Sequence, residues 1–121
     1  MPEPVTRAEL DLLISEANFQ LQVISLAHYT GWKVAHFRGV RIQRANGSVY
    51  YQTPVQADGA GFPDCVFVKG NRVIYAELKT EKGKVSFEQQ EWLDALAAAG
   101  QECYLWRPHD FNEICKVLEG K

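Results

Sequence analysis

Residues 64–79 read DCVFVKGNRVIYAELK, two runs rich in β-branched and aromatic residues that only a Gly-Asn dipeptide separates. Such runs favour strands, and a two-residue connection of this kind is typical of a tight β-hairpin. Counted outward from the turn, the antiparallel pairing places Asp64 opposite Glu77. The pattern therefore predicts a hairpin whose register brings two carboxylates together.

This juxtaposition of carboxylates suggests a cation site. Directly opposed residues of an antiparallel pair share a face, with Cβ atoms about 5 Å apart, and like charges placed there are destabilising. Side chains alternate along a strand, so Lys79 projects from the same face as Glu77. A divalent cation would relieve the repulsion, and Lys79 would orient a water or stabilise charge on a phosphate. The plainer alternative is a solvated strand end with an incidental ion pair.

The segment before this hairpin opens with a long helical pattern. Thr6 and Glu9 form a capping box, apolar residues then recur at helical spacing, and Gly31 is a usual helix-ending residue. We therefore predict one helix over residues 7–29. The next predicted elements are a strand over 32–38, a second hairpin with a tight primed turn at Asn46-Gly47, and a Gly-rich loop over 56–63.

The segment after the hairpin alternates helix and strand. Ser86 and Gln89 form a second capping box, which opens a helix that ends at Gly100. A strand over 103–107 follows, and Asp110 with Glu113 predicts a third capping box before a short C-terminal helix. Together the elements predict an α/β fold in which helices flank a mixed β-sheet.

Composition limits the classes of protein to consider. A chain of 121 residues is expected to form a single domain, and the net charge of −2 argues against a generic basic coat for nucleic acid, though not against a local basic cleft. Three cysteines without close metal-ligand spacing predict reduced thiols in a cytoplasmic protein. We expect no membrane span and no nucleotide cofactor, because neither a long apolar run nor a P-loop is present.

The pattern Pro63-Asp64, an apolar strand, and Glu77-Leu78-Lys79 resembles the PD-(D/E)XK nuclease superfamily. The stretches GFPDCVFV (61–68), AELKTEKGKVSFEQQEWLDAL (76–96) and YLWRP (104–108) narrow the resemblance to the VRR-NUC family, in its small stand-alone phage or bacterial type. With SEANFQ and GWKVAHFR upstream, the resemblance covers nearly the whole chain. It implies a restriction-endonuclease-like fold in the order α-β-β-β-α-β-α. It also implies a Mg²⁺- or Mn²⁺-dependent nuclease that acts on structured or branched DNA, as a Holliday-junction resolvase does, often as a homodimer.

The resemblance also assigns roles to single residues. Asp64, Glu77 and Lys79 match the core catalytic motif, and the backbone carbonyl of Leu78 would be a further metal ligand. Glu16 matches an acidic metal-binding position on the first helix. Its helical neighbours are apolar, so we expect it to border the core rather than open water. Gln89 matches a glutamine at the active site, while its place in the capping box offers a structural reading that does not exclude the first.

DNA contacts are predicted for basic residues near this site. A histidine between apolar strand neighbours is more often structural, and lysines in an exposed turn are by default solvated. Tyr50 and Tyr51 are placed to stack on bases, and the surfaces around them and Trp106 are expected to form a homodimer interface. The predicted DNA-binding residues are His36, Arg38, Arg41, Lys82 and Lys84, with Arg44 in the same basic run.

These observations predict a Mg²⁺- or Mn²⁺-dependent endodeoxyribonuclease that hydrolyses phosphodiester bonds. Two other classes stay open at this point. A nucleic-acid-binding module with the same fold and no turnover would not require Asp64, Glu77 and Lys79 together. A small-molecule phosphohydrolase is less well supported, because the chain has no P-loop or other nucleotide motif. Plasmid nicking in the presence of metal or of EDTA discriminates among them.

Overall fold

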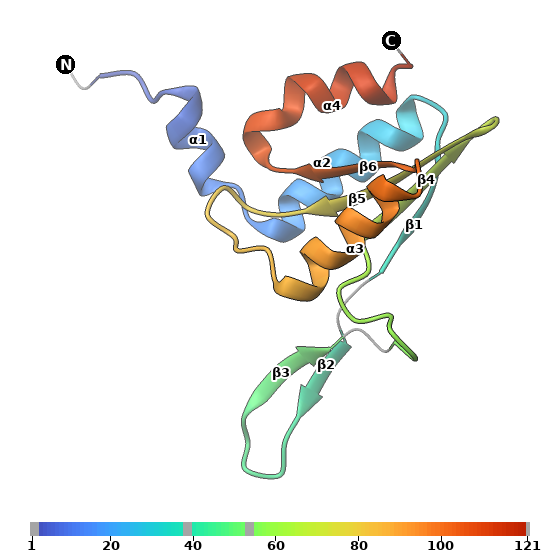
Figure 1. Cartoon of the computed structure of the whole chain (residues 1–121). Helices are drawn as coiled ribbons and strands as arrows, with labels where there is room; N and C mark the ends of the chain where they lie inside the picture. Colours follow the sequence, from blue (N-terminus) through green and yellow to red (C-terminus); the bar gives the residue numbers. More distant parts are fainter. Residues whose placement is uncertain (1–2, 38–39, 53–54, 121) are drawn as a thin grey trace.

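A four-stranded mixed sheet forms the centre of the structure (Figure 1). The computed structural model describes residues 3–37, 40–52 and 55–120. The strands stand in the order β1-β4-β5-β6, in which the first two pairs are antiparallel and β5-β6 is parallel. A separate hairpin of β2 and β3 projects away from this body. The strands are β1 (Lys33–His36), β2 (Val40–Gln43), β3 (Val49–Gln52), β4 (Cys65–Lys69), β5 (Arg72–Leu78) and β6 (Glu102–Trp106).

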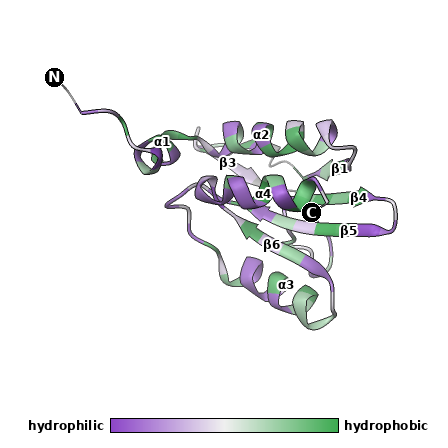
Figure 2. Cartoon of the chain, turned by 90° about the horizontal axis from the view of Figure 1, so that it is seen from above, coloured by the Kyte–Doolittle hydropathy of each residue, from purple (hydrophilic) through white to green (hydrophobic). Residues whose placement is uncertain are grey.

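Helices cover both faces of the central sheet (Figure 2). On one face lie α2 and α4, and on the other lies α3, which provides the crossover that a parallel β5-β6 pair requires. Among the described residues, no helix has the length and apolar character needed to cross a membrane. The helices are α1 (Arg7–Leu13), α2 (Glu16–Tyr29), α3 (Phe87–Ala98) and α4 (Phe111–Leu118), with a 3₁₀ turn at Pro108–Asp110. The mixed α/β class is therefore as predicted.

The core lies between the sheet and the α2–α4 layer. Its strand residues are those whose side chains point to that face, and its helix residues lie at helical spacing. Trp106 is only 2% exposed, so the prediction that it contributes to a surface interface is wrong. The core residues are Phe19, Val23, Ala27, Trp32, Cys65, Phe67, Ile74, Ala76, Leu78, Trp106, Ile114 and Leu118.

The two predicted hairpins both form, with different turns. In β4-β5, Gly70 alone has a positive φ of +60°, which fits the two-residue type II′ turn with glycine first. In β2-β3, the Arg44 carbonyl accepts from the Gly47 N–H, and the Arg44 N–H donates to the Ser48 carbonyl. This is a three-residue loop with Gly47 at φ +88°. The predicted primed turn is wrong because Asn46 does not have a positive φ, which a type I′ turn needs at both central residues.

The predicted helix over 7–29 is in fact two helices. Ile14 and Ser15 are extended, with ψ of 122° and 159°, and they separate α1 from α2. The Ser15 hydroxyl accepts from the Asn18 N–H at 3.1 Å, so a new helix starts there with its own cap. The apolar spacing continued through this break, so it did not signal the end of α1.

The third capping box is also wrong, although a helix does begin at Phe111. The Asp110 carboxylate accepts from the backbone N–H of Arg107 at 2.9 Å and makes no side-chain cap on α4. It stabilises the 3₁₀ turn that precedes the helix. Ser86 with Gln89 makes a complete capping box as predicted, whereas at the start of α1 Thr6 accepts from the Glu9 N–H, which is one of the two bonds of the predicted box.

Candidate active site

The carboxylates of Asp64 and Glu77 meet at one end of the β4-β5 hairpin. Cys65 pairs with Ala76, so one further step along the ladder places Asp64 opposite Glu77, as the turn count predicts. The Leu78 N–H donates to Asp64 Oδ2 at 3.0 Å, and the Asp64 carbonyl accepts from the Phe37 N–H at 2.8 Å. Contacts on both sides therefore hold Asp64 in place at the junction of the two strands.

Glu77 is a buried carboxylate with one oxygen left without a donor. The residue is 1% exposed, and its Oε1 accepts from Gln89 Nε2 at 3.0 Å. Lys79 Nζ lies 3.9 Å from the same oxygen. The second carboxylate oxygen of Glu77, Oε2, is buried and has no hydrogen-bond partner among the described residues. Burial, and next the charge of Asp64, raise the pKa of Glu77 to about 8, although Lys79 acts in the opposite direction.

Gln89 contacts both the start of α3 and the carboxylate of Glu77. Its Oε1 accepts from the Ser86 N–H at 2.9 Å and completes the capping box of α3. Its Nε2 donates to Glu77, so the first turn of α3 orients the carboxylate. The same side chain therefore joins the helix start to the site.

The turn that follows Lys79 is fixed by Arg107, a residue that the sequence analysis did not assign. Arg107 Nη1 donates to the carbonyls of Thr80, Glu81 and Gly83, at 2.6, 3.2 and 2.8 Å. The parallel register of β5 and β6 pairs Leu78 with Trp106, so the residues that follow each of them emerge side by side. A prediction in which β6 runs parallel to β5 would have placed Arg107 beside the turn after Lys79. A basic residue at the carboxyl end of β6 was therefore the sequence signal for this contact.

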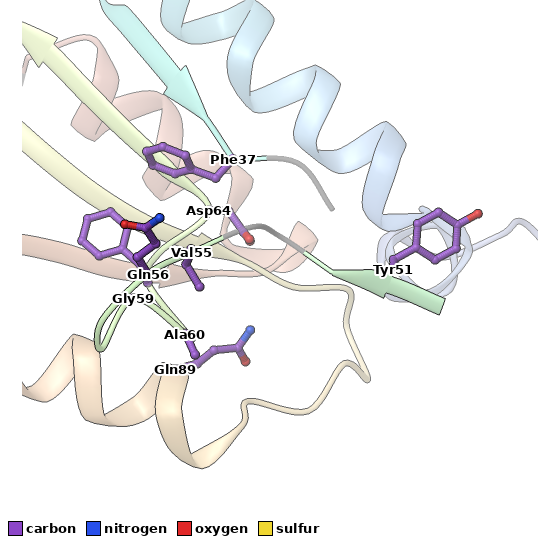
Figure 3. Close-up of a pocket in the computed structure, with 10 residues that line it drawn as sticks. Phe37, Tyr51, Val55, Gln56, Gly59, Ala60, Asp64 and Gln89 are labelled. Atoms are coloured by element: carbon purple, nitrogen blue, oxygen red, sulfur yellow. The ribbon is translucent and has the colours of Figure 1, made fainter. Parts of the chain in front are cut away.

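An open cleft of about 500 Å³ lies beside the carboxylates (Figure 3). Phe62 is in edge-to-face contact with Phe37 and Trp92, with ring centroids 5.7 and 5.1 Å apart. The Trp92 indole N–H donates to the Asp58 carbonyl at 2.9 Å and ties the Gly-rich loop to α3. The lining residues are Phe37, Tyr51, Val55, Gln56, Gly59, Ala60, Gly61, Phe62, Asp64 and Gln89.

Gly61 is required for this loop to approach α3. Its φ is +84°, a conformation that side-chain-bearing residues rarely adopt. A Cβ atom there would lie 2.6 Å from the Glu88 carbonyl carbon and 2.7 Å from the Gln89 nitrogen. The loop backbone therefore rests directly on the first turn of α3, next to the residue that orients Glu77.

The structure brings together Asp64, Glu77, Lys79 and Gln89. Glu16 is exposed on the first turn of α2, so the expectation that it borders the core is wrong. Among the described residues, no group of three His, Cys, Asp or Glu side chains is arranged to hold a metal ion. The Leu78 N–H is bound to Asp64, and a ligand role for its carbonyl stays a prediction.

Among the described residues, none of the basic side chains predicted to contact DNA lines the cleft. His36 pairs with Cys65, which places it on the sheet face opposite to Glu77, and its Nε2 is buried without a partner among the described residues. Arg41 is exposed on β2, and Lys82 and Lys84 are exposed in the turn after Lys79. Arg38 lies outside the described residues.

Comparisons of this chain with protein-family models, with curated proteins and with solved structures gave no match.

Proposed function

We propose that the protein is a Mg²⁺- or Mn²⁺-dependent endodeoxyribonuclease. The observation that carries this proposal is the buried Glu77 carboxylate, which faces Asp64 and keeps a buried oxygen without a donor while Lys79 lies beside it. A buried carboxylate that faces a second carboxylate and keeps one oxygen without a donor is costly to a fold unless a proton or a cation binds there. The site adjoins an open cleft, so a substrate phosphate has access to it.

The residues present fit a magnesium-type ion. Mg²⁺ is usually held by one or two carboxylates, and waters and substrate phosphates complete its coordination. Asp64 and Glu77 would hold the ion. Glu16 is not included among these ligands, because it is exposed and, among the described residues, no third acidic side chain groups with Asp64 and Glu77. Such an ion, when bound, polarises a phosphate and lowers the pKa of a coordinated water.

The remaining residues position this pair and the substrate. Gln89 and the Leu78 N–H hold the two carboxylates in place through the hydrogen bonds described above. Lys79 presents an ammonium group that donates to a phosphate oxygen or to the attacking water, where negative charge develops. Exposed Arg41, Lys82 and Lys84 supply local positive charge for the DNA backbone on a chain whose net charge is −2.

The order of elements supports the finer assignment of fold. Without α1 and the projecting β2-β3 hairpin, the chain runs α2-β1-β4-β5-α3-β6-α4, which is the α-β-β-β-α-β-α order that the resemblance implies. We therefore propose a restriction-endonuclease-like fold of the VRR-NUC type, in a cytoplasmic protein without a nucleotide cofactor. Structured or branched DNA is the proposed substrate class.

One observation favours a second candidate, a DNA-binding module without turnover. Within the part of the chain that the structure describes, no third acidic side chain joins Asp64 and Glu77. A module of this kind would bind DNA equally well with and without metal and would leave the strands intact. The experiment below separates the two functions.

We expect millimolar Mg²⁺ or Mn²⁺ to raise the melting temperature of the protein and to support nicking of supercoiled plasmid. The rise in melting temperature follows from relief of the repulsion between Asp64 and Glu77, and nicking follows from the polarisation of the phosphate that a bound ion would supply. Asp64→Asn should lose both effects, and EDTA should abolish nicking by the wild type. Thermal melting and gel electrophoresis provide the measurements, with Asp58→Asn in the Gly-rich loop as the matched control. Identical melting curves with and without metal would contradict the proposed site.

We also propose a homodimer, since coordinated cutting of both strands of a branched DNA needs two sites related by symmetry. Trp106 is buried, so the part of the predicted interface that remains is the projecting β2-β3 hairpin, on the face that carries Tyr50 rather than Tyr51. Light scattering at tens of micromolar, with and without DNA, should report twice the chain mass of 13.7 kDa. A monomer under both conditions would rule the dimer out.

A further inference from the structure

The described lining of the cleft is largely apolar, and Asp64 is the one charged side chain in it. Its described lining residues include no lysine, arginine or histidine, and Asp64 is the one carboxylate among them. Phe37 and Phe62 supply aromatic surface, while Gln56 and Gln89 supply amide groups that both donate and accept hydrogen bonds. A phosphate group would find no cation in such a wall. A neutral, planar group with polar edges would find partners for its faces and for its edges.

The β2-β3 hairpin completes this cleft with one of its two tyrosines. Arg41 pairs with Tyr51, and Ile42 pairs with Tyr50, so the two tyrosines project from opposite faces of the hairpin. Tyr51 reaches the cleft, and Figure 3 shows Asp64 between Tyr51 and Phe37. Tyr50 instead lies under the Arg44 guanidinium, 4.4 Å from the ring centroid. Tyr51 alone of the two is therefore available to a group in the cleft.

We propose that this cleft receives one unpaired base of the DNA strand whose phosphate lies at Asp64 and Glu77. This inference rests on the proposed function, since it names the part of the substrate that the same site holds. Asp64 lines the cleft, so a base held in it belongs to a nucleotide close to the phosphate at Asp64 and Glu77. Its volume of about 500 Å³ falls within the range of roughly 300–1,000 Å³ found for small-ligand sites.

The physical chemistry of the cleft selects an unpaired base rather than a base pair. A base enters an aromatic pocket only when it has left the stack, and the energy needed is smallest for a base that has no partner. Stacking on aromatic side chains then compensates for the lost stacking, with little dependence on base identity. The preferred substrates are therefore DNA structures with an unpaired nucleotide beside the cut, such as gaps, bulges and branch points.

Binding measurements test this inference without relying on cleavage. Two duplexes carry a single-nucleotide bulge, which holds either a normal base or an abasic tetrahydrofuran analogue. Both are titrated in Mg²⁺ with the Lys79→Ala protein, in which cutting is expected to be lost. Removal of the base should weaken binding by roughly tenfold or more, in keeping with measured stacking contributions.

Two further substitutions, each made in that background, examine the cleft itself. Tyr51→Ala removes a lining ring, and Ala60→Trp fills the cavity; both residues are exposed, so the core stays intact. Each should weaken binding of the intact bulge by a similar factor and should abolish the distinction between base and abasic site. The matched controls are Tyr50→Ala, on the other face of the hairpin, and Ala45→Trp, at its exposed turn.

The outcomes separate this inference from the proposed function. Binding that is equal for the two bulges, or a distinction that survives Tyr51→Ala and Ala60→Trp, would overturn the base-binding cleft while DNA binding stands. Failure to bind either duplex, together with an inability of the wild type to nick plasmid, would overturn both. Loss of the distinction in the two cleft variants and its retention in both controls supports the inference.

Discussion

Glu77→Gln is expected to stabilise the metal-free protein and at the same time to abolish DNA cleavage. The glutamine amide removes a buried charge that Asp64 opposes, and its N–H group can donate to the Asp64 carboxylate. In the wild type, the pKa of Glu77 is about 8 in the folded state against an ordinary value of 4.5. The contribution of Glu77 to the free energy of unfolding is therefore fully present below pH 4.5 and is lost as the pH rises through 8.

Melting curves from pH 5 to pH 9 in EDTA provide the measurement. The wild-type melting temperature should fall across this interval, whereas Glu77→Gln should give a flatter curve and lie several degrees above the wild type at pH 9. A change of about 1 kcal/mol corresponds to roughly 4 °C in a domain of this size. Glu91→Gln, an exposed residue of α3, is the matched control and should follow the wild type. A variant that is less stable than the wild type at pH 9 would contradict the described repulsion.

Lys79→Ala is expected to lower the rate of cleavage by roughly 100-fold or more, a size typical of losing one preorganised group that stabilises transition-state charge. The two carboxylates remain in this variant, so the metal-dependent rise in melting temperature should persist. The separation of chemistry from metal binding is the diagnostic feature. Single-turnover nicking rates and melting curves with and without Mg²⁺ measure the two properties independently.

The neighbouring lysines provide the control for Lys79. Lys82 and Lys84 are exposed in the turn that follows, and replacing either with alanine should change the rate only a few-fold, through weaker attraction to the DNA backbone. That few-fold effect should disappear at high salt, whereas the loss in Lys79→Ala should not. Near wild-type cleavage by Lys79→Ala would remove its assigned role.

The sequence predicted the candidate site well because one short turn determines its register. Two residues separate β4 from β5, so each pair of opposed residues in the hairpin follows by counting from the turn. The pairing of Asp64 with Glu77 can therefore be predicted without knowing the rest of the fold. Gln89 was also found, because a capping box is a local pattern of backbone and side chain. Contacts that depend on a few consecutive residues are the ones that sequence patterns report.

Other features depend on contacts between distant segments and were missed. Arg107 contacts the turn after Lys79 only because β6 returns parallel to β5, and a single strand pattern does not reveal its neighbour in a sheet. The aromatic cluster of Phe37, Phe62 and Trp92, of which the first two line the cleft, comes from three separate segments. The break at Ser15 was hidden for a different reason, since apolar residues on both sides kept the helical spacing.

The double role of Gln89 limits which mutations this protein could accept during evolution. Glutamate would still accept from the Ser86 N–H and would suit the helix cap, but it would add a third negative charge beside Glu77. A lysine would donate to Glu77, yet it has no oxygen for the cap. Two separate demands, one for an acceptor and one for a donor, therefore meet in one amide, and each excludes substitutions that the other would tolerate.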